Sequence, residues 1–125
     1  MANIVNTFFT TDVYNSEIHL EINEDILNNI HADGIKPNDK LQVEFVFITD
    51  NEDKAVQFKN NLLLQFPFYS KIFIEKADDF WDIHGVTNDI EMSLNEINNW
   101  NQTMWDFGYQ YDCQLDGWQV GVDKN

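Results

Sequence analysis

The 125-residue sequence predicts an α+β fold: a ferredoxin-like βαββαβ sandwich, with an antiparallel sheet and two helices on one of its faces. Three observations predict it. Some segments alternate apolar and polar residues as strands do, and two longer ones repeat apolar residues at helical spacing. Their order along the chain is β-α-β-β-α-β. A chain of this length forms a single core, so we expect one domain over residues 23–125.

Residues 1–22 precede this pattern and are predicted to be an N-terminal arm or an edge strand. Residues 17–22 place an apolar side chain at every second position, which is typical of a strand. Asn23 then supplies a capping side chain for a short helix over about 24–32, whose first turn is acidic. Gly34 is expected to end that helix.

The strongest strand prediction covers 41–48, where one face is apolar throughout and the other becomes apolar toward the end, as in a central strand. Residues 49–52 combine hydroxyl, amide and acidic side chains that begin a helix over about 51–65. Pro67 ends this helix. Two alternating runs separated by a short acidic turn then predict a β-hairpin over 69–86.

Ser93 and Glu96 form a capping box at the start of the last helix. Its apolar residues recur every three or four positions: Ile97, Trp100, Met104 and Phe107. Gly108 is predicted to end the helix, and 109–122 to form the last strand. Within the predicted last helix, Trp105 lies one residue off the apolar stripe and is the tryptophan expected to be most exposed.

The charge balance restricts the partners. Twenty-two acidic residues face seven lysines and no arginine, giving a net charge of −15. Such a field repels phosphate backbones and anionic lipids, so neither direct nucleic-acid binding nor membrane binding is expected. A basic protein partner would be attracted. Solubility alone is the alternative explanation.

Sequence patterns for catalysis, cofactors or metals are not found. The three histidines, His19, His31 and His84, have no ligand spacing, and the acids at 78–82 do not follow a calcium loop. Cys113 is the only cysteine, so it is expected to be a small buried apolar residue. With no secretory signal and no apolar run of bilayer length, we expect a cytoplasmic protein without cofactors.

Several motifs together resemble the RraB family, regulators of ribonuclease E activity. They are a helix ending near Gly108, the Tyr111-Asp112 step, and the triplet Asp116-Gly117-Trp118, with the upstream order of elements also similar. The resemblance covers about 24–122. Leu115 stands where the best-known members carry tyrosine before the triplet, and Asp123 is the only acid after it. The resemblance implies a non-catalytic α/β sandwich that inhibits an RNA-degrading enzyme by protein contact.

The predicted partner-binding residues are Asp112, Asp116, Gly117 and Trp118, with the tryptophan as an anchor and the two aspartates at its rim. A structural alternative stays open: Gly117 supplies a bulge or a positive φ, and Trp118 packs under the last helix. For function, the alternative is an immunity or antitoxin-like protein that neutralises a basic toxin, because small size and acidity fit both.

Overall fold

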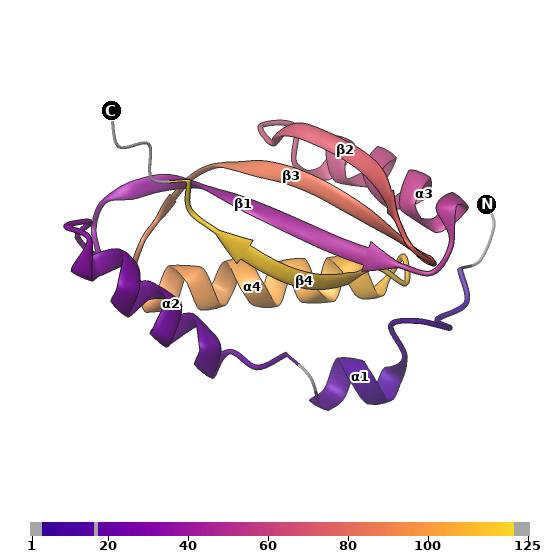
Figure 1. Cartoon of the computed structure of the whole chain (residues 1–125), viewed down its shortest axis with the longest axis horizontal. Helices are drawn as coiled ribbons and strands as arrows, with labels where there is room; N and C mark the ends of the chain where they lie inside the picture. The colour runs from indigo at the N-terminus through magenta and orange to yellow at the C-terminus, as the bar shows by residue number, and fades with distance from the viewer. Residues whose placement is uncertain (1–3, 17, 122–125) are drawn as a thin grey trace.

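A computed structural model describes residues 4–16 and 18–121 (Figure 1). The helices are α1 (Thr11–Ser16), α2 (Glu21–Ala32), α3 (Glu52–Gln65) and α4 (Leu94–Tyr109). The strands are β1 (Lys40–Thr49), β2 (Ser70–Ala77), β3 (Phe80–Glu91) and β4 (Gln114–Gln119). From β1 onward the order is β-α-β-β-α-β, as the sequence predicts.

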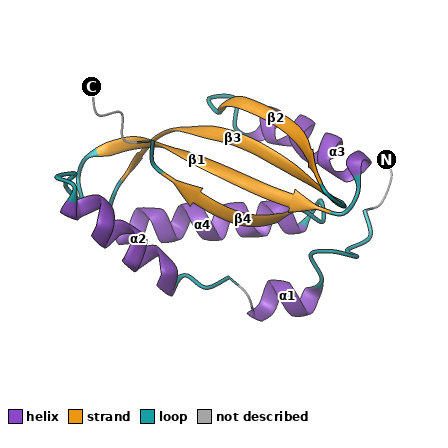
Figure 2. Cartoon of the chain, viewed as in Figure 1, coloured by secondary structure: helices purple, strands orange, loops and turns teal. Residues whose placement is uncertain are grey.

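The strands form one antiparallel sheet in the order β2-β3-β1-β4. The prediction of an α+β fold with an antiparallel sheet is therefore confirmed. In Figure 2, α3 and α4 lie behind the sheet, and α2 lies beside β4. No helix within 4–16 and 18–121 crosses the sheet face turned toward the viewer, which we call the open face.

Alternation along β1 separates the two faces. The side chains buried on the helix side are those of Val43, Phe45 and Phe47. The centre of the Phe47 ring lies 4.5 Å from the centre of the Phe58 ring in α3. The centre of the Phe45 ring lies 6.2 Å from the centre of the Trp100 ring in α4. Burying these aromatic rings against two helices stabilises the core, by about 25 cal/mol per Å² of apolar surface removed from water.

The N-terminal region corrects the prediction of an edge strand. The described residues before α2 contain the helix α1 and no strand. Asn23 does not cap α2, because the helix already begins at Glu21 after Leu20 and Asn23 is buried within it. Of the three apolar side chains in the alternating pattern, Ile18 and Leu20 lie in the loop before α2, and only Ile22 lies within the helix.

Strand β3 continues to Glu91, five residues beyond the predicted end. Its polar second half pairs with the start of β1, from Lys40↔Glu91 to Gln42↔Asp89. At the irregularity that follows, the buried hydroxyl of Thr87 accepts a hydrogen bond from the Val43 N–H at 2.9 Å. The Thr87 hydroxyl thus replaces the backbone hydrogen bond that Val43 lacks at this irregularity. The local sequence does not reveal this substitution.

The last helix and strand also differ in their limits. Helix α4 continues past Gly108 to Tyr109, and β4 spans only Gln114–Gln119. A Cβ atom at Gly108 would overlap the backbone oxygen of Cys113 and lie 2.9 Å from the Phe47 ring. Gly108 therefore permits close packing and does not end the helix. The predicted end of the strand at residue 122, and Asp123, lie outside the described residues.

Candidate functional site

The turn before β4 is organised around Asp112, which is fully buried. Its carboxylate accepts hydrogen bonds from the backbone N–H groups of Thr7, Phe8 and Phe9, and from Lys54 Nζ at 2.6 Å. Its backbone adopts a positive φ of 56°, which aspartate tolerates better than most residues. Asp112 thus ties the N-terminal loop to the start of β4.

The pKa values of this cluster reflect its hydrogen bonds. Burial alone would raise the pKa of Asp112, but the Lys54 contact and the backbone N–H groups outweigh it and lower that pKa. Burial would lower the pKa of Lys54, but its bonds to Asp112 and Asp50 raise it. Asp112 is therefore held as a charged, internally paired group. The prediction that it rims a partner surface is wrong, because a partner cannot reach it.

The triplet that follows lies in β4, and only part of it is accessible. Phe47 pairs with Leu115 and Val46 with Gly117, so Asp116 is the extra residue of a β-bulge. Its side chain is exposed. Gly117 has no positive φ, and a Cβ atom there would have no neighbour within 4 Å. The strand therefore contains a bulge beside Gly117, but the extra residue is Asp116, and the positive φ expected at Gly117 is not observed.

Trp118 lies on the helix side of the sheet, opposite Phe45. Its Nε1–H donates to the buried Oδ1 of Asn23 at 2.9 Å, while Asn23 Nδ2 donates to Asn98 Oδ1, also at 2.9 Å. The edge of one indole ring faces the other between Trp118 and Trp100, with the ring centres 6.4 Å apart. Trp118 is half-buried, and it holds α2 against the edge of the sheet. This supports the structural interpretation of the residue.

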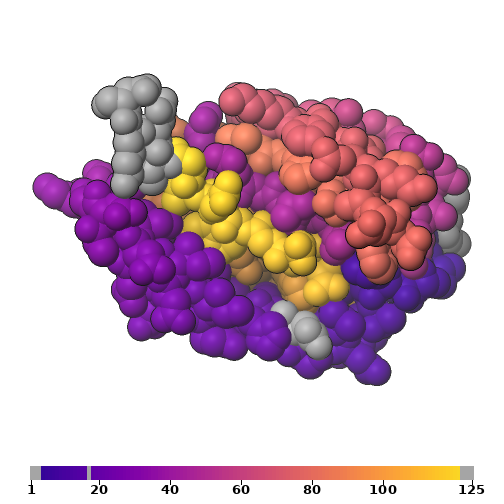
Figure 3. Space-filling view, in the orientation of Figure 1, coloured from indigo at the N-terminus to yellow at the C-terminus, as the bar shows by residue number. Residues whose placement is uncertain are grey.

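Two hollows meet at the triplet. The first, which we call the α2–β4 groove, has a volume of about 330 Å³ and is lined by α2 and β4, including Ile22, Ile26 and all three triplet residues. The second, the sheet hollow, has a volume of about 390 Å³ and is lined by Val46, His84 and Gly117, among others. In Figure 3, β4 is the yellow band between α2 and the rest of the sheet. Asp116 lines only the groove.

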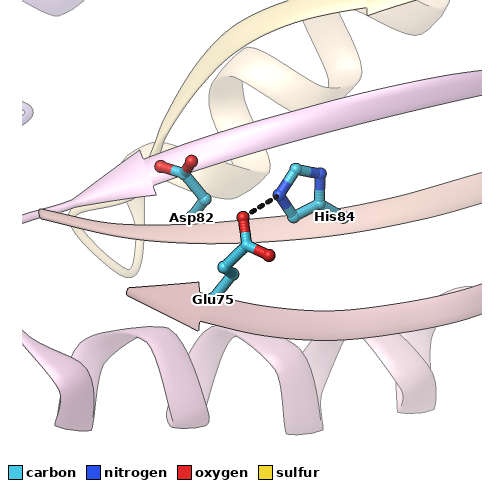
Figure 4. Close-up of side chains that lie close together, drawn as sticks. All are labelled: Glu75, Asp82 and His84. Atoms are coloured by element: carbon cyan, nitrogen blue, oxygen red, sulfur yellow. Dashed lines mark ion pairs between the residues drawn. The ribbon is translucent and has the colours of Figure 1, made fainter. Parts of the chain in front are cut away.

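The open face also brings together groups from the hairpin. Glu75 of β2 pairs with Asp82 of β3, and His84 follows two residues later on the same face. Figure 4 shows the three side chains close together, with the Glu75 carboxylate directed toward the His84 ring. One ligand atom from each lies within 4.8 Å of the others. Carboxylate and imidazole are metal ligands, so this is where the described residues can hold a cation.

The charges around Asp82 shift its pKa. Burial is the largest cause and raises that pKa; Asp116 and Glu75 raise it further, while His84 lowers it. The net shift is upward. The carboxylates of Glu75 and Asp82 therefore lie side by side on the open face, and Asp116 of the family-like triplet is close enough to contribute to the shift at Asp82.

Two other predictions are settled by burial. Trp105 is 3% exposed and donates its Nε1–H to the Tyr14 carbonyl at 3.0 Å, so the expectation that it is the most exposed tryptophan is wrong. Helix α1 covers it, and α1 was not predicted. Cys113 is buried as expected, and burial raises the pKa of its thiol.

Sequence reasoning missed two sets of contacts. One is the Asp112 clamp, by which we mean the Asp112 carboxylate with the backbone N–H groups of the N-terminal loop and Lys54. The other is the Glu75–Asp82–His84 cluster. The clamp joins residues about a hundred positions apart, so no local signal could have found it. The cluster had a signal: acid and histidine two positions apart on a strand, with another acid across the predicted hairpin. Spacing rules for helices and loops do not detect it.

The comparisons with known proteins agree with the geometry. The family model for RraB, Regulator of ribonuclease activity B, matches residues 20–120, from just before α2 to just after β4. The match therefore includes both walls of the α2–β4 groove. The comparison with curated proteins gives no match. None of the helices among the described residues is long and apolar enough to cross a bilayer.

Proposed function

This chain belongs to the RraB family of regulators of ribonuclease activity, and we propose that it binds a basic surface of a ribonuclease E-type enzyme or its scaffold. The proposed action is inhibition in the cytoplasm by protein contact, without catalysis. The observation that carries the proposal is the family match over the segment that builds the α2–β4 groove.

The proposed contact surface is the α2–β4 groove. Asp116 is exposed on the bulge and supplies charge, and Gly117 leaves open space beside it. Ile22, half exposed on the opposite wall, offers apolar area. An acidic side chain facing apolar residues across the groove suits a basic partner, because charge complementarity raises the association rate while apolar burial holds the complex.

Trp118 and Asp112 have supporting roles in this proposal. Trp118 fixes one wall through its bond to Asn23, and Asp112 fixes the turn from which β4 begins. We further infer the ferredoxin-like arrangement from the β-α-β-β-α-β order after α2 together with the sheet order β2-β3-β1-β4.

Cleavage of a fluorescent single-stranded RNA by the ribonuclease E-type enzyme of the same source tests the proposal. Adding the purified protein should slow cleavage, and rising salt should weaken the inhibition. Asp116→Lys should weaken it about tenfold or more, because reversing a charge inside an interface is unfavourable. Asp33→Lys is the matched control: the same charge change at an exposed position that lines neither hollow.

An equal loss of inhibition in the two variants would reduce the effect to net charge and remove the groove from the proposal. No inhibition by the unmodified protein at any salt concentration would overturn the proposed function. Tight binding to a basic toxin, with no effect on the ribonuclease, would favour the immunity hypothesis instead.

A further inference from the structure

We propose that Glu75, Asp82 and His84 form a binding site for a divalent transition-metal ion of the zinc class on the open face of the β2–β3 hairpin. The site is independent of the proposed contact with a ribonuclease. It rests on the register of the two strands, on an imidazole nitrogen without a hydrogen-bond partner, and on the chemistry of the three ligands.

The register places the ligands. Glu75 and Asp82 are direct cross-strand partners, and Phe73 pairs with His84. Side chains two residues apart on one strand share a face, so all three groups point away from the helices. Because the hairpin hydrogen bonds fix these positions, the cluster does not depend on a flexible loop.

The His84 ring presents an available donor atom to the cluster. Its Nε2 has less than 1 Å² of accessible surface and no hydrogen-bond partner among residues 4–16 and 18–121. The nearest acid oxygen, Glu75 Oε1, lies 4.0 Å away, which is an ion-pair contact too long for a hydrogen bond. A buried polar atom normally finds a partner, so this nitrogen is suited to a ligand that the three side chains share.

The ring is also held in place. His84 stacks on Phe73 with ring centres 4.6 Å apart and planes 11° from parallel. The stacking leaves the ring edge that carries Nε2 directed toward the two acids (Figure 4). A fixed imidazole lowers the entropy cost of binding, whereas the exposed Glu75 can move to complete the coordination.

The separations suit one small ion. Ligand atoms around a tetrahedral zinc ion lie about 3.3 Å apart, since the bonds are about 2.0–2.2 Å long. The observed separations, all within 4.8 Å, reach that value through side-chain rotation of the two acids. An imidazole ligand favours zinc-class ions over calcium and magnesium, which prefer oxygen ligands alone. Water would complete the coordination on the solvent side.

The surrounding charge favours a cation. Glu75 and Asp82 bring two like charges together as direct cross-strand partners, in a chain whose net charge is −15. A bound ion would offset this repulsion and link β2, an edge strand, to β3. We therefore expect binding to raise the thermal stability of the protein in addition to occupying the three ligands.

Calorimetric titration of chelator-treated protein with zinc chloride tests the site. We expect one ion per chain, a rise in melting temperature, and a cobalt-substituted form with the visible absorption of a tetrahedral site. His84→Asn should weaken zinc binding by about 100-fold or more, since even partners of the ligands change affinity by about 10–100-fold. Glu75→Gln, at an exposed position, should weaken it without affecting folding.

His19→Asn is the matched control, because His19 also lies beside an acid, with Nδ1 3.2 Å from Glu21 Oε1. It should leave zinc affinity unchanged. Zinc binding that survives both His84→Asn and Glu75→Gln would overturn the proposal. So would calcium or magnesium binding as tight as zinc, which would indicate a general attraction of cations to acidic side chains.

Discussion

The segment from Gly108 to Trp118 contains two glycine–aspartate pairs with opposite roles. Asp112 is fully buried with its carboxylate bonded on several sides, whereas Asp116 is exposed on a bulge. A Cβ atom would collide with neighbours at Gly108 and meet nothing within 4 Å at Gly117. The first pair builds the fold and the second remains available to a partner. Residue type does not separate them; their surroundings do.

Asp112→Ala should produce the largest effect. It removes the acceptor of three backbone N–H groups and leaves Lys54 without its closest acid. We expect a loss of about 3–5 kcal/mol in the free energy of unfolding, as for other buried ion pairs that lose one member. Urea denaturation followed by tryptophan fluorescence measures it. Asp116→Ala should change stability by no more than about 0.5 kcal/mol, and equal losses would erase the distinction between the two aspartates.

Gly108→Ala should come next. The added methyl group would overlap the Cys113 carbonyl and press on the Phe47 ring, and a backbone oxygen cannot rotate away. We expect a net loss of about 2–3 kcal/mol, even though alanine is the better helix former by about 1 kcal/mol. Gly117→Ala is its control and should stay within about 0.5 kcal/mol. A tolerated Gly108→Ala would show that α4 can shift away from the turn.

Asn23→Ala tests the link between the two walls of the groove. It leaves the indole N–H of Trp118 without its acceptor, at an expected cost of about 1–2 kcal/mol. A double-mutant cycle with Trp118→Phe should give a coupling energy of about 1 kcal/mol. Strictly additive losses would mean that the hydrogen bond does not hold α2 to β4.

The smallest effect is expected in the acid dependence of stability. The folded pKa of Asp112 is lowered, so its stabilisation is present above the unfolded value of about 3.9 and is lost as pH falls through the folded pKa. The difference in unfolding free energy between the unmodified protein and Asp112→Asn should therefore shrink below about pH 4. Urea midpoints from pH 7 to pH 2.5 measure it. A difference that is constant with pH would contradict the assignment of charge.

Local patterns predicted the main elements well where side chains carry strong signals. Ser93 caps α4 as expected, with its hydroxyl accepting from the Glu96 N–H. The α3 cap is supplied by Asn51, within the predicted stretch. The predictions failed at 18–22, where the alternating residues form the loop before α2 and its first turn, and in β3, where polar residues extend a strand by pairing.

The candidate site was predicted only in part. The triplet was found because its residues are adjacent, and Asp116 is exposed as a partner contact requires. Trp118 and Asp112 were assigned to the same surface, but one bonds to α2 and the other to the N-terminal loop. These contacts span about a hundred residues. Their partners are brought close only by the folded chain.

By itself, the sequence determined the acidic character, the order of strands and helices from residue 40 onward, and membership in a family of regulators. These depend on composition and on periodicities that extend over a few residues. Only the tertiary structure decided which aspartate is buried, which glycine is crowded, and that Glu75 faces Asp82 and His84. The physical reason is that burial and ligand geometry depend on neighbours across strands and helices, which local spacing does not specify.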